Sequence, residues 1–105
     1  MNTVLTLRQT VLCDGQLDCG AKLLFVALLD KALSPIHWVR RGTVVVSAGW
    51  LEEHLHIPRR SAHRWSRQLE RKGYLSIGKQ PLASGWSVNA YTINGLTQDQ
   101  EARAA

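Results

Sequence analysis

Acidic residues, cysteine and long apolar runs are all scarce in this chain of 105 residues, and each scarcity excludes a class of protein. The longest apolar run, residues 23–29, spans seven residues, whereas a membrane helix needs roughly 20. The N-terminus has no basic segment followed by an apolar one, so we expect no signal peptide. The length suits one domain and excludes a two-domain enzyme. We therefore expect a single cytoplasmic domain without a membrane segment.

Catalytic and metal-binding patterns are also missing. Cys13 and Cys19 form no Cys-x-x-Cys motif, and we expect two reduced, partly buried thiols, with a disulfide across a small loop as the alternative. The histidines lack carboxylate or thiolate partners at ligand spacing, so no metal is expected. No nucleophile–base pair, Gly-rich phosphate loop or pair of acids for proton transfer is present; Glu52 and Glu53 suit the start of a helix, where the dipole favours anions. The sequence predicts neither an enzyme nor a cofactor.

What the chain has in excess is positive charge, and this charge is concentrated in the middle. The formal net charge is +5, with 13 Lys and Arg against 8 Asp and Glu. Residues 37–80 carry nine bases and three acids, while the flanking segments are close to neutral. Nine of the 13 bases are arginine, whose planar fork suits phosphates and guanine edges. This pattern indicates an anionic partner, nucleic acid or acidic lipid, and the arginine-rich block suits nucleic acid better than a solvated surface.

The first half of the chain predicts a lead-in segment and an apolar helix. Residues 1–17 fit either a strand or a short helix, and we treat them as a lead-in element that is a possible dimer contact. A helix over residues 18–33 follows, with Asp18 as its N-cap and Pro35 beyond its end. This helix is apolar on almost all sides, so it must be covered widely, by the domain itself or by a second copy of the chain.

The second half alternates short strands and helices. The residue pattern predicts, in order, a loop at 36–42, a strand at 43–46, a helix at 48–55 capped by Ser47, a helix at 58–72 beginning at Pro58, a strand at 74–78, a hairpin tip at 79–85 and a returning strand at 86–93. Gly73 suits the end of the third helix. Residues 95–105 read as a polar, disordered tail.

The third predicted helix has two contrasting faces. At 100° per residue, Ala62, Trp65, Ser66 and Leu69 cluster on one side. The opposite side, about 180° away, carries the arginine ridge, which consists of Arg60, Arg64, Arg67 and Arg71. Surface helices usually interleave acids with bases, because like charges three or four residues apart repel. Glu70 is the single acid of this helix, so a polyanionic partner explains the ridge better than a solvated face does.

The segments SAGWLEEHLHIP, PRRSAHRWSRQLERKGYLSI and AYTIN together resemble bacterial winged helix-turn-helix DNA-binding domains of the transcription-regulator and plasmid or phage replication-initiator kind. The likeness covers residues 18–94 and implies an α+β fold with three main helices and a C-terminal two-stranded β-hairpin wing. It departs from the family pattern at Ser66, where a large apolar residue is usual, and at Pro58, where Ser or Thr usually caps the helix.

The resemblance implies how each residue meets double-stranded DNA. The recognition helix over residues 58–72 enters the major groove with its N-terminal half closest to the bases. The expected DNA-binding residues are Ser47, Arg59, Arg60, Ser61, His63, Arg64, Arg67, Arg71, Lys79, Gln80 and Ser84. Arg60 or Arg64 suits guanine, and Arg67 and Arg71 suit phosphate. Ser47 offers a further phosphate contact at a helix start, and Lys79, Gln80 and Ser84 lie on the wing. Arg40 and Arg41 form a secondary basic patch.

The four tryptophans divide by expected environment. We expect Trp65 in the core, and Trp50 and Trp86 covering its edges. Trp38 lies close to Arg40 and Arg41, where it either contacts a protein partner or packs back on the first apolar helix.

The sequence thus predicts a sequence-specific duplex DNA-binding protein of the bacterial nucleoid, acting as a homodimer by occupying DNA. The role implied is a small repressor or a replication or partition factor of a mobile element. Two alternatives stay open, namely a sequence-indifferent DNA-coating protein and a protein–protein adaptor on a winged-helix fold.

Overall fold

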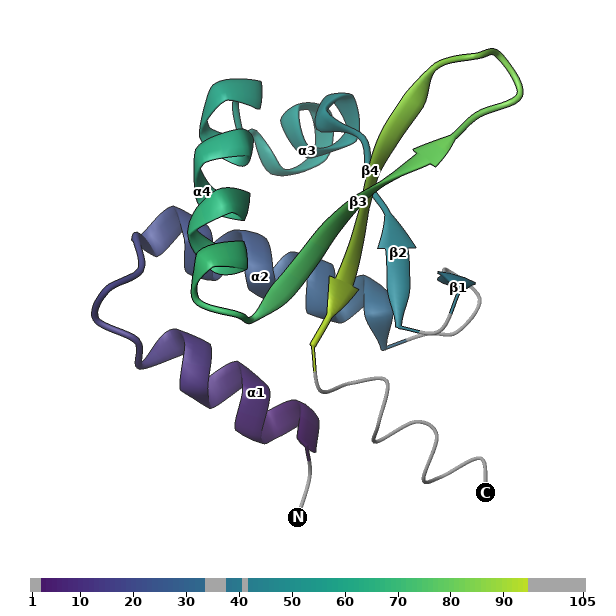
Figure 1. Cartoon of the computed structure of the whole chain (residues 1–105). Coiled ribbons are helices and arrows are strands. Elements are labelled where there is room, and N and C mark those ends of the chain that lie inside the picture. Colours follow the sequence, from purple (N-terminus) through teal and green to yellow (C-terminus); the bar gives the residue numbers. More distant parts are fainter. Residues whose placement is uncertain (1–2, 34–37, 41, 95–105) are drawn as a thin grey trace, which may run out of the picture.

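The computed structural model describes residues 3–33, 38–40 and 42–94 and has an α+β architecture, which confirms the α+β part of the predicted fold (Figure 1). Within these residues, four helices and four strands follow one another: α1 Thr3–Leu12, α2 Cys19–Ala32, β1 Trp38–Arg40, β2 Thr43–Val45, α3 Ala48–Leu55, α4 Arg59–Arg71, β3 Leu75–Pro81 and β4 Ser87–Ile93. The lead-in element, which the sequence left open between strand and helix, is helical over α1. The predicted tail, residues 95–105, lies outside the described residues.

The strands form one antiparallel sheet in the order β1-β2-β4-β3. The prediction of a loop over residues 36–42 was wrong at 38–40, where Trp38 pairs with Val44 and Arg40 with Thr43. Three residues carry too little periodicity to predict a strand, but pairing with β2 satisfies their backbone groups. The predicted hairpin tip was also too long, because β3 continues through Lys79 to Pro81, which pairs with Ser87.

Helix α2 supplies the centre of the core. Its side chains Leu24, Phe25, Leu28 and Leu29 are fully buried, and the helix packs against α4, β2 and β4. The rest of the domain does not cover α2 completely, since Leu23 stays 52% exposed. The predicted cap position of Asp18 is confirmed, but its side chain makes no cap hydrogen bond. Its carboxylate instead accepts from the Gln68 amide at 2.8 Å, which ties the start of α2 to α4.

Short turns orient α3 and α4. Ser47 caps α3 as predicted, its hydroxyl oxygen accepting from the Trp50 backbone N–H at 3.0 Å. His56 ends the helix with a left-handed φ of 57°, the conformation in which helices commonly stop. Pro58 proves to be the N-cap of α4 rather than its first residue, with an extended backbone. Its ring still precedes the helix without blocking a hydrogen bond of the helix interior.

Trp65 and Trp86 have different environments from each other. Trp65 is half-buried and packs against the core, with its ring lying over the backbone of Gly20 in α2. Trp86 was expected to cover the core edge, and this was wrong, because it is 78% exposed. The extension of the hairpin past the body of the domain carries Trp86 away from the core.

A polar cluster joins the turn between α1 and α2 to the end of α4. The Asp14 carboxylate accepts from the Tyr74 hydroxyl at 2.7 Å and from the Gln16 backbone N–H at 2.8 Å, and Lys72 Nζ lies 3.2 Å away. The hydrogen bond from Tyr74, more than any other contact, lowers the pKa of Asp14 below its usual range, and the same bond raises the pKa of Tyr74. The cluster therefore favours a charged Asp14 beside a neutral Tyr74.

This cluster predicts a specific loss of stability in acid. Because the pKa of Asp14 is lower in the folded state, its contribution is complete above the unfolded value of about 3.9 and is lost as the pH falls through the folded value. We expect the free energy of unfolding, measured by urea denaturation from pH 6 to pH 3, to fall less steeply in Asp14→Asn than in the wild type. Asp30→Asn, which removes an exposed carboxylate of α2, is the matched control. Parallel pH profiles for wild type and Asp14→Asn would contradict the assignment.

Candidate nucleic-acid interface

The arginine ridge is exposed along the whole of α4. Arg60, Arg64, Arg67 and Arg71 all face solvent, and Arg59 at the first turn is exposed as well. The opposite face is buried as predicted, through Ala62, Ser66 and Leu69. Ser66 fits this face because its hydroxyl donates to the His63 backbone carbonyl at 3.0 Å. The hydroxyl is thereby satisfied inside the protein without a large apolar side chain.

Few acids compete for these arginines. Arg67 forms an ion pair with Glu70 at 3.0 Å, but both side chains are partly solvated, and such surface pairs contribute about 1 kcal/mol or less. Arg64 lies over the Trp65 ring, 5.8 Å from its centroid. Within residues 3–33, 38–40 and 42–94, Arg60, Arg64 and Arg71 make no ion pair with an acid. The ridge therefore keeps most of its charge available for a ligand.

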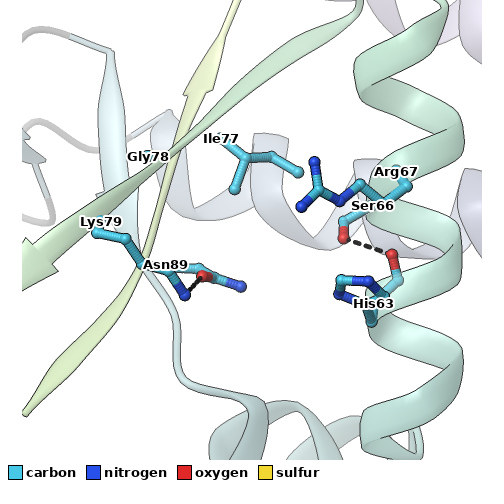
Figure 2. Close-up of a pocket in the computed structure, with 7 residues that line it drawn as sticks. All are labelled: His63, Ser66, Arg67, Ile77, Gly78, Lys79 and Asn89. Carbon is cyan, nitrogen blue, oxygen red and sulfur yellow. Dashed lines mark hydrogen bonds between the residues drawn. The ribbon is translucent and has the colours of Figure 1, made fainter.

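A hollow lies between α4 and the β3–β4 hairpin (Figure 2). Its walls come from His63, Ser66 and Arg67 on α4 and from Ile77, Gly78, Lys79 and Asn89 on the hairpin. Lys79 Nζ donates to the Asn89 side-chain oxygen at 2.7 Å, and the Asn89 amide donates to the Tyr91 hydroxyl at 3.2 Å. Burial raises the pKa of Tyr91, so the hydroxyl stays neutral while it holds Asn89. These two hydrogen bonds together hold the ammonium of Lys79 at the wall of the hollow.

A second hollow adjoins the first and shares Lys79 and Asn89 with it. Its other walls are the start of α3 at Ser47, Ala48 and Gly49, together with Arg59, Ser87 and Val88. The Arg59 guanidinium comes within 3.7 Å of the place where a Cβ on Gly49 would stand. We call the two hollows together the helix–hairpin groove. Its walls combine an arginine, a lysine and the N-terminal end of a helix, all of which attract anions.

The remaining predicted residues are not among those that line this groove. Ser61 is half-buried on α4, and Ser84 is exposed at the hairpin tip. Gln80 is half-buried and pairs with Val88, on the other face of the hairpin from Lys79, because side chains alternate along a strand. Arg40 belongs to β1, and Arg41 lies outside the described residues, so the secondary basic patch stays a prediction.

Sequence reasoning missed Asn89 and Ser87. The signal was present, because Ser87 and Asn89 share the predicted strand face with Tyr91 and Ile93. When one face of a strand is apolar at one end and polar at the other, the polar end is expected to extend beyond the core. Only the register, with Lys79 opposite Asn89, reveals that this region faces α4.

The described residues offer little support for other kinds of site. The thiols of Cys13 and Cys19 are free and exposed, so the expectation of partial burial was wrong, since both flank the exposed turn between α1 and α2. Among these residues no three His, Cys, Asp or Glu side chains are grouped as metal ligands. No helix in the described part of the chain combines the length and apolarity needed to cross a membrane.

Comparison with known proteins gives no match among protein-family models, curated proteins or solved structures. The function of this chain is therefore inferred from the geometry of α4, α3 and the hairpin.

Proposed function

We propose that residues 18–94 form a winged helix-turn-helix domain that binds double-stranded DNA sequence-specifically, with α4 in the major groove and the β3–β4 hairpin as the wing. The observation that carries the proposal is the arginine ridge beside the helix–hairpin groove. The ridge alone suits many anions. A ridge on an exposed helix, flanked by a second cationic wall on a projecting hairpin (Figure 1), suits an elongated polyanion.

The dimensions of α4 support duplex DNA. A helix of 13 residues is roughly 20 Å long and 10–12 Å wide with its side chains, and the major groove of B-DNA is about 12 Å wide. The helix has an exposed side that can enter this groove, because its buried side holds it to α2 and α3. An RNA duplex fits less well, since its major groove is too narrow for side chains to read.

The residues divide by role in this proposal. Arg60 and Arg64, in the first two turns of α4, read guanine through paired hydrogen bonds, with Ser61 and His63 at the flank of the same surface. The phosphate contacts come from the residues that line the helix–hairpin groove, namely Ser47, Arg59, Arg67 and Lys79. Arg71, in the last turn of α4, adds a further phosphate contact. Gln80 and Ser84 add wing contacts.

Lys79 tests the phosphate assignment separately from base reading. We expect Lys79→Ala to weaken binding evenly across different duplexes and to reduce the slope of log K against log salt by about one. Fluorescence anisotropy at several salt concentrations measures both quantities. Lys22→Gln, which removes one charge from α2, is the matched control and should leave the slope unchanged. A Lys79→Ala slope equal to that of the wild type would remove Lys79 from the interface.

Footprinting on random and native upstream DNA tests the function as a whole. A discrete protected site supports a repressor or a replication or partition factor that acts by occupying DNA. A cooperative, spreading pattern supports the DNA-coating alternative instead. Absence of duplex binding, together with retention of a protein partner in a pull-down, would support the adaptor and refute the proposal.

We also propose that the protein acts as a homodimer in the bacterial cytoplasm and nucleoid, with residues 1–33 forming the contact. Exposed leucines on α1 and α2 support this surface: Leu5 is 55%, Leu12 46% and Leu23 52% exposed. Two-fold symmetry would match paired half-sites about one helical turn apart. The sedimentation coefficient of the DNA-free protein distinguishes a dimer from a monomer, and a monomer at micromolar concentration would contradict the dimer.

A further inference from the structure

The tip of the β3–β4 hairpin exposes an apolar pair that the groove does not use. Trp86 is 78% exposed and Leu82 is 43% exposed. Exposed large apolar residues are ordinary when single, but a tryptophan this exposed is uncommon on a surface without a binding role. Neither residue contributes to the core of the domain.

Backbone hydrogen bonds fix the positions of these two residues. Strand pairing continues to Pro81 and Ser87, and the Leu82 N–H then donates to the Trp86 carbonyl at 2.7 Å. The Gly85 N–H donates back to the Leu82 carbonyl at 3.0 Å, and Gly85 has the positive φ of 92° that this tight turn requires. Because opposite residues of an antiparallel pair share a face, Leu82 and Trp86 lie side by side. The tip is therefore an ordered apolar wedge rather than a loose loop.

The surroundings of the wedge favour a polyanion over other partners. No acidic residue stands between Glu70 and Asp99, so nothing on the hairpin repels phosphate. The next two residues of β4 after Trp86, Ser87 and Val88, line the helix–hairpin groove. The wedge thus adjoins the end of the groove in sequence, on the hairpin face of Gln80 and Val88 rather than on that of Lys79 and Asn89. Figure 1 shows the tip projecting from the end of the molecule where α4 begins, which is the end that the proposal places on DNA.

Strand geometry gives the reach of the wedge. Trp86 precedes Asn89 by three residues, which corresponds to about 10 Å along an extended strand. With Lys79 and Asn89 on the phosphate backbone beside the major groove, this distance is long enough for the tip to reach past the backbone to the neighbouring minor groove. Apolar side chains that enter the minor groove of DNA act by separating adjacent base pairs.

We propose that Trp86, supported by Leu82, inserts between two base pairs from the minor groove, unstacking them and bending and untwisting the duplex. This inference depends on the proposed DNA binding and adds a deformation step to it. Unstacking costs energy, but base stacking on an aromatic ring offsets it. Recognition then includes the deformability of the step beneath the tip, so that flexible pyrimidine–purine steps are favoured there.

The test is a topoisomer assay on a closed circular plasmid, relaxed by a topoisomerase in the presence of the full chain. Filter binding is used to set the same density of bound protein on the DNA for every variant. Because Trp86→Ala loses its stacking on a base, we expect it to need about tenfold more protein to reach that density. We expect the wild type to shift the linking number as bound density rises and Trp86→Ala to lose most of this shift. Trp86→Phe, which keeps a flat ring, should retain at least half of it. Val39→Ala, which shortens an exposed apolar side chain of β1, should behave as the wild type.

Each other outcome overturns the inference in an identifiable way. An undiminished shift in Trp86→Ala at matched density means that the tip does not insert, while the proposed DNA binding stands. Loss of the shift in Trp86→Phe as well as in Trp86→Ala assigns the effect to a role other than stacking. A smaller sedimentation coefficient of DNA-free Trp86→Ala, with the shift retained, makes the tip a contact between copies. Failure of the wild type to bind duplex in the filter assay refutes the proposed function and the wedge together.

Discussion

Replacing Arg60 and Arg64 together by alanine is expected to weaken binding to a specific duplex by about 2–6 kcal/mol, or roughly 30-fold to 10⁴-fold. Each arginine that forks onto a guanine contributes about 1–3 kcal/mol, and contacts to separate base pairs are close to additive. Both side chains are exposed on the same face of α4, so their removal leaves the core intact. Arg64→Ala alone should cost about 1–3 kcal/mol and relax discrimination at one base position.

The measurement is fluorescence anisotropy with a duplex selected from a random pool by the wild-type protein. Lys22→Gln/Lys31→Gln is the matched control, since it removes two positive charges from α2 and leaves α4 unchanged. We expect the control to lose little affinity and to keep the wild-type base preference. If the control and the Arg60/Arg64 variant lost affinity equally, the ridge would contribute only net charge. If the Arg60/Arg64 variant bound as tightly as the wild type, α4 would not be the recognition helix.

Gly20→Ala is expected to lower the free energy of unfolding by about 1–3 kcal/mol, although alanine is the better helix former. A Cβ on Gly20 would overlap three atoms of the Trp65 ring. Helix propensity gains about 1 kcal/mol from the change, but overpacking costs typically 1–3 kcal/mol and displacing Trp65 also gives up its contact with the core. The steric cost therefore exceeds the gain in helix propensity, because the rigid tryptophan ring cannot rearrange to make room for the added methyl group.

Urea denaturation with a double-mutant cycle checks this reason. Trp65→Leu removes the ring, so Gly20→Ala should cost less in that background than in the wild type, and the two changes should be coupled. Gly78→Ala is the matched control, since a Cβ there meets nothing within 4 Å. A loss of stability in Gly20→Ala that is the same with and without the Trp65 ring would contradict the close approach of α2 and α4.

Local chemistry made most of the elements predictable. Ser47 before an apolar run, Pro58 before an arginine-rich one and Gly73 after it fix the ends of α3 and α4 to within one residue. The 3.6-residue period of α4 separates Ala62 and Leu69 from the arginine ridge, and the observed burial follows it. The ends and the faces of a helix depend on residues that are close together in the chain, and they can therefore be predicted from the sequence.

Short or partly covered elements were harder to predict. Strand β1 spans three residues and exists through its pairing with β2, which no local pattern reveals. The same applies to Trp86, whose apolar surface suggested a place at the edge of the core. Its exposure depends on how far the hairpin extends beyond the helices, a property of the register between β3 and β4 and not of the residue.

The sequence by itself determined the α+β class, the helix that carries the arginine ridge and the excess of positive charge in the middle of the chain, because periodicity, caps and composition act over a few residues. The tertiary structure alone decided which residues face one another across the helix–hairpin groove and what the hairpin tip presents. Lys79 and Asn89 meet His63 and Arg67 only because α4 and the hairpin pack side by side on α2 and the sheet. Contacts between residues distant in the chain arise from the packing of whole faces, and a single sequence does not specify that packing residue by residue.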